Sequence, residues 1–179
     1  MNRLAFLLLA LLPIATLAQS LPESFTTGPA IPDHGPVALQ PDNAFNLVPG
    51  EVYRVVFDVA FGSEGAHVLN RRLESVARFI NLHARAGIDP DDLDIEVVTH
   101  GGSLFDVLSR EAYRERFEVD HPNADLVDAL IHAGVTLYLC GQSASARGVG
   151  ADELAPGVKL AHSAMTVLVR RQAEGWATL

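Results

Sequence analysis

The sequence predicts an α/β protein, a three-layer α/β/α sandwich around a five-stranded parallel sheet. Runs rich in β-branched and aromatic residues alternate along the chain with segments of helical apolar spacing. This alternation favours a parallel sheet, because parallel neighbours must be joined by crossovers, which place helices on the faces of the sheet. The 179 residues suffice for one domain with a full core but are short for two.

Residues 1–18 have the composition of a secretory signal peptide. Arg3 is their only charge, and a Leu-rich run from Leu4 to Leu12 precedes a break at Pro13. The run is shorter than the roughly 20 residues that span a bilayer, and it contains no cysteine for lipid attachment. We therefore expect cleavage after Ala18, export to the periplasm or the medium, and no membrane attachment of the mature chain.

Residues 19–50 form a proline-rich extended arm before the domain, which we place at 51–179. No helical or strand period in the arm is long enough to predict an element. Two interpretations stay open: a disordered linker, or an arm whose apolar residues lie along the domain or a neighbouring subunit. Those apolar residues are Phe25, Ile31, Val37, Leu39, Phe45 and Leu47.

The first half of the domain reads as strand, helix, strand. The segments Tyr53–Ala60 and Ile95–His100 have strand composition, and His67–Ala86 between them is the clearest helix. On this helix Glu74 and Arg78 have the i, i+4 spacing of an ion pair. Its sheet-facing stripe is Leu69, Leu73, Val76 and Ile80.

Two more helices follow, and the chain then ends in a short strand, a helix and a strand. Leu104–Phe117 looks helical, with charges that mark a solvated face. Asn123 is placed to cap the next helix, which stops at Gly134. The closing elements are a strand at Val158–His162, a helix from the cap Ser163 through Glu174, and a strand at Trp176–Leu179.

The stretch Gly134–Gly148 contains the only cysteine, Cys140, at the end of a buried strand. In α/β sheets, binding and catalytic residues lie at the carboxyl ends of the strands. The N–H groups at the start of a following helix stabilise a thiolate relative to the thiol. Cys140 is therefore a candidate nucleophile. The alternative is that it is a small buried apolar side chain, as free cysteines often are. Position alone leaves both interpretations open.

Composition excludes several classes of partner and site. The net charge is −9 and the only lysine is Lys159, so nucleic acid and anionic membranes are disfavoured as partners. A single cysteine allows no disulfide within the chain. The seven histidines show no ligand spacing typical of a metal site, so we expect no metal and no cofactor.

The chain resembles the DsrE/DsrF-like family, specifically its exported, single-cysteine branch. The resemblance implies a sheet order of 4-3-2-1-5, assembly of identical chains into trimers or hexamers, and a cysteine, here Cys140, that carries persulfide sulfur. The sulfur-relay members of the family are cytoplasmic and work with partner proteins, whereas this chain has an export signal. The segments that carry the resemblance are 55–59, 79–81, 97–101, 134–143, 154–159 and 163–165, of which Cys-Gly-Gln at 140–142 is the most specific.

In the strand order of this family, His100 and His162 follow the strands on either side of the Cys140 strand. A neighbouring imidazole can take the proton of a thiol and stabilise the thiolate. In a flavodoxin-like order, His100 would lie one strand further away. Gly141 lets the chain turn beside the sulfur, and the amides of Gln142 and Ser143 are placed to bind a thiolate or a persulfide anion.

Two functions remain in view. The first is a periplasmic thiol protein that exchanges sulfur with a donor or acceptor protein, or reacts with small thiols, through Cys140. The second is a non-catalytic oligomeric module whose strand-end pocket binds a small ligand or a partner. No nucleotide, kinase or Ser-His-Asp signature supports another class of enzyme.

Overall fold

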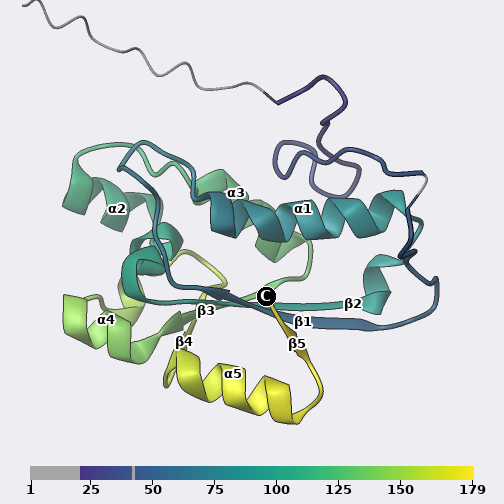
Figure 1. Ribbon diagram of the computed structural model, residues 1–179. Helices are drawn as coiled ribbons and strands as arrows, with labels where there is room; N and C mark the ends of the chain where they lie inside the picture. The colour runs from purple at the N-terminus through teal and green to yellow at the C-terminus, as the bar shows by residue number, and fades with distance from the viewer. Residues whose placement is uncertain (1–20, 42) are drawn as a thin grey trace, which may run out of the picture.

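The computed structural model describes residues 21–41 and 43–179, so the predicted signal peptide lies outside the described residues. The sheet has five parallel strands in the order β4-β3-β2-β1-β5, which confirms the expected fold and strand order (Figure 1). In the part of the chain that is described, no helix is long and apolar enough to cross a membrane. The strands are β1 (Tyr53–Val59), β2 (Leu93–Thr99), β3 (Thr136–Cys140), β4 (Lys159–Ala161) and β5 (Ala177–Thr178).

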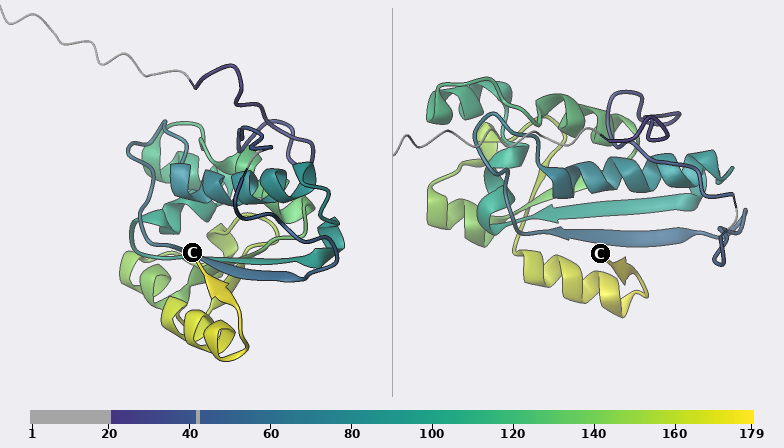
Figure 2. Two further views of the ribbon diagram at one scale, coloured as in Figure 1. Left: turned by 45° about the vertical axis from the view of Figure 1, so that its right-hand side comes forward. Right: turned by 45° about the horizontal axis from the view of Figure 1, so that its top comes forward.

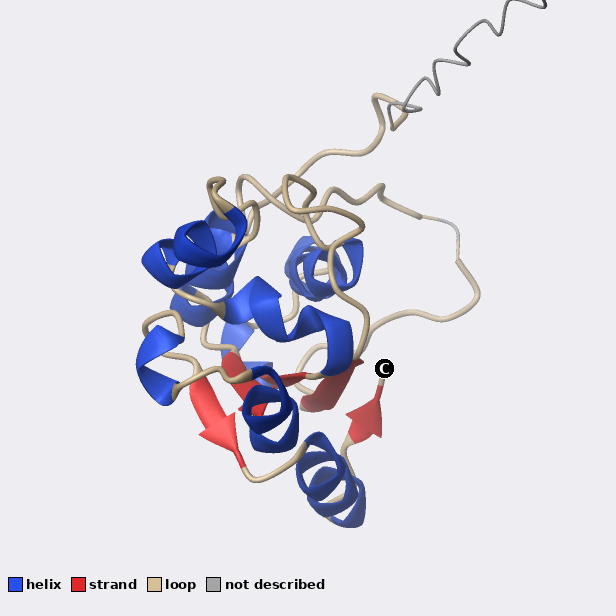
Figure 3. Cartoon of the chain, turned by 90° about the vertical axis from the view of Figure 1, so that its left-hand side faces the viewer, coloured by secondary structure: helices blue, strands red, loops and turns tan. Residues whose placement is uncertain are grey.

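Helices lie on both faces of the sheet (Figures 1, 2 and 3). Helices α1 (Arg71–Arg85), α2 (Arg110–Phe117) and α3 (Ala124–His132) lie above it in Figure 1, and α5 (Ala164–Ala173) lies below. Helix α4 (Gly141–Arg147) continues directly from the carboxyl end of β3. The described residues also contain three short 3₁₀ helices: η1 (Pro90–Asp92), η2 (Gly101–Val107) and η3 (Ala151–Glu153).

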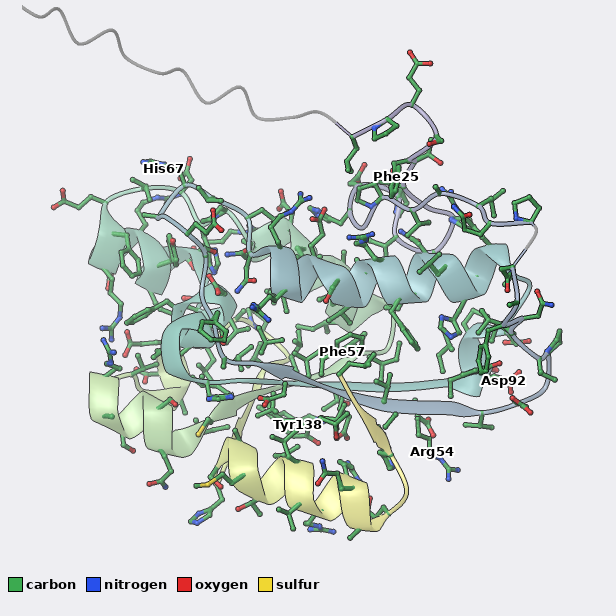
Figure 4. The ribbon with its side chains drawn as sticks, viewed as in Figure 1. Phe25, Arg54, Phe57, His67, Asp92 and Tyr138 are labelled. Carbon is green, nitrogen blue, oxygen red and sulfur yellow. The ribbon has the colours of Figure 1, made fainter. Side chains whose placement is uncertain are left out.

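The two faces of the sheet bury unequal cores. Alternation along β1 sends Val55, Phe57 and Val59 into the large core under α1 and α3. Val56 points the other way, into a small cluster with Cys140 that lies under α5 and Trp176. Figure 4 shows the contrast, with Phe57 and Tyr138 on opposite sides of the sheet.

Two helices differ from their expected bounds because of local capping. Helix α1 begins at Arg71, since the Asn70 side chain accepts hydrogen bonds from the second and third N–H groups after it, and His67 lies in the loop before α1 (Figure 4). The expected helix 104–117 is two elements, η2 and α2. They are separated because Ser109 is the N-cap of α2 and accepts from the N–H of Ala112.

The proline-rich arm packs on α1, as one of the two interpretations expected. Ile31 and Val37 are each only 1% exposed, whereas Leu39 and Phe45 point into solvent. The Asn81 side chain exchanges hydrogen bonds with the backbone of Ile31 and also donates to the carbonyls of His34 and Gly35. In Figures 1 and 4 the arm lies on the outer side of α1.

Glu74 does not pair with Arg78 as the i, i+4 spacing suggested. Its carboxylate pairs with Arg71 at 3.1 Å and accepts a hydrogen bond from the N–H of Gly35 at 3.4 Å. The arm therefore draws this carboxylate to its own side of α1, and Arg78 is left on the surface.

Candidate thiol site at the carboxyl ends of the strands

Cys140 lies at the carboxyl edge of the sheet, where β3 ends and α4 begins. It is the last residue of β3 and the N-cap residue of α4. Its side chain is 5% exposed and belongs to the small cluster on the α5 face, with Val56, Val98 and Ala164. The sequence placed the cysteine at this strand end, and the structure adds that it lies between the sheet and α5.

The pKa of Cys140 lies below its ordinary value although the thiol is buried. Burial is the largest single influence and raises the pKa, because a thiolate loses hydration. The backbone N–H groups of Ser143 and Ala164 oppose it, helped by the Ser143 hydroxyl and the Gln142 N–H, and together these donors outweigh burial. They come from the first turns of α4 and α5, where N–H groups have no partner within the helix. Two helix N-termini therefore converge on one sulfur atom.

Gly141 is required by the close approach of the turn between β4 and α5. A Cβ at this position would lie 2.7 Å from the carbonyl oxygen of Ala161 and 3.2 Å from that of His162. The side chain of Gln142 reinforces the same contact, since its Nε2 donates to the His162 carbonyl at 3.3 Å. The turn that starts α5 is thereby held against α4, beside the thiol.

Ser143 links the thiol site to the loop after β2. Its Oγ accepts a hydrogen bond from the N–H of Gly101 at 3.1 Å. Gly101 has φ +57°, a left-handed conformation that favours glycine. The predicted ligand-binding residues Gly141, Gln142 and Ser143 thus lie together around Cys140.

His100 lies beside Cys140 along the sheet edge, but its ring is engaged on the other side. Thr99 is in register with Leu139, so His100 and Cys140 are the next residues on neighbouring strands. The His100 Nε2 lies 2.7 Å from Oδ1 of Asp58 on β1, the strand on the far side of β2. The groups that lower the pKa of Cys140 are amides and a hydroxyl rather than an imidazolium.

His162 follows the other neighbouring strand. Ala161 is in register with Cys140, so His162 is one residue beyond it. The exposed His162 side chain lines a cavity of about 310 Å³ with Tyr138 and Arg170, and Cys140 is not part of this lining. Both predicted histidines therefore follow the strands that flank the Cys140 strand. The His100 side chain contacts Asp58, whereas the His162 side chain lines a cavity that does not include Cys140.

Two contributors to the site were missed in the sequence. Asp58 lies on the same face of β1 as Val56, and an acid after the apolar run 55–57 was a usable signal in the sequence. Ala164 contributes through its N–H alone, and no side-chain pattern reveals that. Its effect depends on where α5 begins in space.

The buried histidines His83 and His121 have structural partners. The His83 Nδ1 lies 2.8 Å from the Phe79 carbonyl oxygen. The His121 Nδ1 accepts from the N–H of Asn123 at 3.1 Å, so its ring is neutral with the hydrogen on Nε2. Across residues 21–41 and 43–179, no group of three or more His, Cys, Asp or Glu side chains is arranged to hold a metal ion.

A buried carboxyl organises the neighbouring loops at this edge. Asp106 is 2% exposed and accepts from Ser63 Oγ, Asn70 Nδ2 and Asn123 Nδ2 at 2.8, 2.5 and 2.9 Å. Burial raises the pKa of Asp106, and the hydrogen bonds from Asn70 and Ser63 partly offset the rise. Asn123 does not cap α3 with its side chain, because that amide is committed to Asp106, Ser63 and the N–H of Asn70.

Comparisons with known proteins agree with this architecture. The model of the DsrE/DsrF-like family matches residues 52–179. The protein of unknown function MTH1491 from Methanobacterium thermoautotrophicum is similar in structure, with a TM-score of 0.55 and 28% identity over 71% of this chain and 97% of that chain. The ychN protein from E. coli shares the fold, with a TM-score of 0.52 and 15% identity over 72% of this chain and 100% of its own. No curated protein sequence matches the chain.

Proposed function

The chain belongs to the DsrE/DsrF-like family, and from this premise we propose that it is a periplasmic sulfur carrier that holds sulfur as a persulfide on Cys140. The Cys140 thiolate attacks the outer sulfur of a donor persulfide, R–S–S⁻. A new S–S bond forms to Cys140, the donor S–S bond breaks, and the donor leaves as the thiolate R–S⁻. The exchange needs no external oxidant, because the bond formed and the bond broken are both S–S bonds.

One observation carries the proposal: hydrogen-bond donors from two helices surround a buried thiol and lower its pKa. A thiolate is the nucleophilic form of cysteine, and donors that stabilise it also stabilise the negative charge of a persulfide. The donors of Gln142, Ser143 and Ala164 supply this stabilisation without a basic side chain. Burial then protects the persulfide from water and stray oxidants.

The pair of His100 and Asp58 borders the thiol site in this proposal. His100 is adjacent to Cys140 on the next strand, and Asp58 orients its ring at 2.7 Å. The ring faces Asp58, and the groups that lower the pKa of Cys140 are amides and a hydroxyl, so in this proposal the thiolate forms without an imidazole as its base.

Intact-protein mass spectrometry tests the carrier function. We expect the mature protein, incubated with a persulfide donor such as glutathione persulfide, to gain about 32 Da, the mass of one sulfur atom. Dithiothreitol should remove the added mass, and Cys140→Ser should not acquire it while keeping the same thermal unfolding. A wild-type protein that stays unmodified, with the donor shown to be active, would refute the carrier function.

The second candidate is a non-catalytic oligomeric module, which the 5% exposure of Cys140 favours. Here the turn held by Gly141 and Gln142 closes over a thiol that only fills space. Alkylation separates the two candidates. A carrier must admit a small reagent to Cys140 in the native state, whereas a filler reacts only at the rate of global unfolding.

Export and self-assembly belong to the same proposal. We propose that the mature protein begins near Gln19 and works in the periplasm, because residues 1–18 have the composition of a signal peptide. We also propose a homo-trimer or homo-hexamer as its working form, as the family resemblance implies. N-terminal sequencing of the protein from a periplasmic extract tests the location. A chain that retains Met1 and fractionates with membranes would contradict it.

A further inference from the structure

Three faces of helix α1 can be distinguished, and the described residues of the chain cover two of them. One faces the sheet through residues such as Leu73 and Val76, and a second holds the arm through Asn81. The third face carries Arg72, Ser75, Arg78, Phe79 and Leu82. It opens on a cavity of about 360 Å³ beside β1 and Leu179.

The floor of this cavity is apolar. Phe57 and Phe79 meet edge to face, with ring centroids 5.7 Å apart and an interplanar angle of 80°. Leu82 and Leu179 also line the floor of the cavity. They are 43% and 60% exposed, which is more than the exposure of core side chains. An aromatic pair with two exposed leucines is an attractive surface for an apolar chain.

The rim of the cavity is basic. Arg72 and Arg78 both line it, and neither forms an ion pair with a described residue. Arg72 lies over the ring of Phe61, with its guanidinium carbon 4.6 Å from the centroid, so its position is defined. The carboxylate of Asp58 in the same lining is already engaged by His100. Most other arginines do form ion pairs, namely Arg54, Arg71, Arg110, Arg114, Arg116, Arg170 and Arg171.

We propose that this cavity binds an amphipathic monocarboxylate, with the carboxylate on Arg72 and Arg78 and the hydrocarbon on the floor formed by Phe57, Phe79, Leu82 and Leu179. Guanidinium groups bind carboxylates strongly, and Arg72 and Arg78 form no ion pair with a described residue although the chain has a net charge of −9. The volume lies at the lower end of the roughly 300 to 1,000 Å³ of small-molecule sites, so the ligand is a short-chain or single-ring acid. This site is separate from Cys140 and does not rest on the sulfur-carrier proposal.

Calorimetric titration of the mature protein with octanoate tests the proposal. We expect octanoate to bind saturably. Octan-1-ol, which has the apolar chain without the charge, should bind at least about tenfold more weakly than octanoate. Arg72→Gln combined with Arg78→Gln should weaken octanoate binding by about tenfold or more. Arg147→Gln is the control, because Arg147 is exposed and forms no ion pair among the described residues, and it should bind like wild type.

Amide chemical shifts locate the bound ligand independently of affinity. Octanoate should shift the amides of Ser75, Phe79 and Val59, which line the cavity. Thermal unfolding of each variant verifies that the arginine replacements leave the fold intact. The proposal is overturned if octanoate gives no saturable binding up to about 10 mM, if the double variant binds as wild type does, or if the shifts cluster away from α1 and β1.

Discussion

Cys140 shows how one residue can be buried and still be poised to ionise. Transfer of a thiolate from water into a protein is unfavourable, so a buried thiol normally stays protonated. Here hydrogen-bond donors of Ser143, Ala164 and Gln142 lower the pKa of the thiol and outweigh its burial. They are fixed by the backbone of two helices and need no reorganisation when the charge forms.

The Ser143 hydroxyl gives the first prediction, which concerns the reactivity of Cys140. Ser143→Ala removes one of the groups that lower the pKa of the thiol but leaves the backbone N–H in place. Loss of one such hydrogen bond should slow iodoacetamide alkylation at neutral pH about fivefold. The rate should recover at higher pH, where the thiolate forms without help. The control is Ser145→Ala on the exposed side of α4, and an equal loss in both variants would contradict the prediction.

His121 gives a prediction about acid stability. Burial, followed by the charge of Arg110, lowers its pKa to about 4, and its Nε2 has no hydrogen-bond partner among the described residues. The unfolded chain therefore takes up a proton on this ring near pH 6.5, whereas the folded chain does not. Its contribution to stability is complete above pH 6.5 and is lost as the pH falls to about 4. The loss should be about 3 kcal/mol.

Urea unfolding of wild type and His121→Asn at pH 7 and pH 4.5 measures this effect. Asparagine keeps an acceptor for the N–H of Asn123 but does not titrate, and it loses the stacking on Tyr113, whose ring centroid is 4.1 Å away. The variant should be less stable at pH 7 and lose less free energy of unfolding between the two pH values. If wild type and His121→Asn lose the same free energy of unfolding between pH 7 and pH 4.5, groups other than His121 cause the acid sensitivity.

At the scale of elements, α5 is attached to the sheet by an ion pair rather than by a large apolar core. Arg171 of α5 contacts Glu96 of β2 at 2.6 Å, and the Glu96 side chain is 8% exposed. The same guanidinium lies 4.7 Å from the centroid of the Trp176 ring. The apolar cluster beneath α5 is small, so the ion pair between Arg171 and Glu96 contributes much to holding α5 in its position on the sheet.

Arg171→Met should therefore destabilise the protein by about 3 kcal/mol, because it leaves a buried carboxylate without its partner. Adding Glu96→Leu should restore part of that loss, since the unpaired charge disappears. Arg54→Met is the control, because the Arg54–Asp94 pair is about half exposed on both sides and should contribute less than about 1 kcal/mol. Urea unfolding of wild type, the double variant and the two single variants measures these free energies. Equal losses of unfolding free energy in Arg171→Met and Arg54→Met would contradict the expectation.

The arm depends on two side chains of α1. Asn81 is fully buried and is hydrogen-bonded to Ile31, His34 and Gly35, and Arg85 donates to the carbonyls of Thr26, Gly28 and Val37, among others. Asn81→Ala leaves several buried backbone groups unsatisfied, which should cost about 2 to 3 kcal/mol. Hydrogen exchange should rise from Thr26 to Val37 and remain unchanged in β2. Asn46→Ala, at an exposed amide of the same arm, should have no effect, and protection that survives in Asn81→Ala would show that the apolar contacts suffice.

The sequence predicted the strands but left the position of the arm open, for physical reasons. Strand composition and the stripe of α1 follow from burial that repeats at a fixed period, and that period is visible in the residues. The arm is held instead by hydrogen bonds from Asn81 and Arg85 to main-chain carbonyls. Any backbone offers such carbonyls, so the residues of the arm gave no sign of where it docks.

At the scale of the whole molecule, the strand order decides which side chains meet. Local pattern predicted the five strands, but their order came from the family resemblance. That order brings His100 and Cys140 to adjacent strand ends and sets Asp58 one strand further. The contact between Asp58 and His100 could not be predicted, because it joins side chains of residues that lie 42 positions apart in the sequence.

The last prediction concerns assembly, and it rests on apolar residues that the monomer leaves uncovered. Met165 and Val169 of α5 are 73% and 65% exposed, and Leu160 on the edge strand β4 is 49% exposed. Met165 and Val169 are four residues apart, so they share one side of α5. Exposed apolar groups on an edge strand and its neighbouring helix indicate a protein–protein contact. A contact that repeats head to tail closes into a ring, which fits a trimer, or a hexamer of two such rings.

Light scattering on the mature protein at micromolar concentration should therefore give the mass of a trimer or hexamer. Val169→Asp introduces a charge that must lose its hydration at the contact, and it should shift the mass toward the monomer. Ala133→Asp places the same charge on an exposed position after α3, on the opposite side of the sheet, and should leave the assembly intact. A monomeric wild type would remove the assembly proposal. If both variants remain oligomeric, the assembly proposal stands but the interface does not include α5.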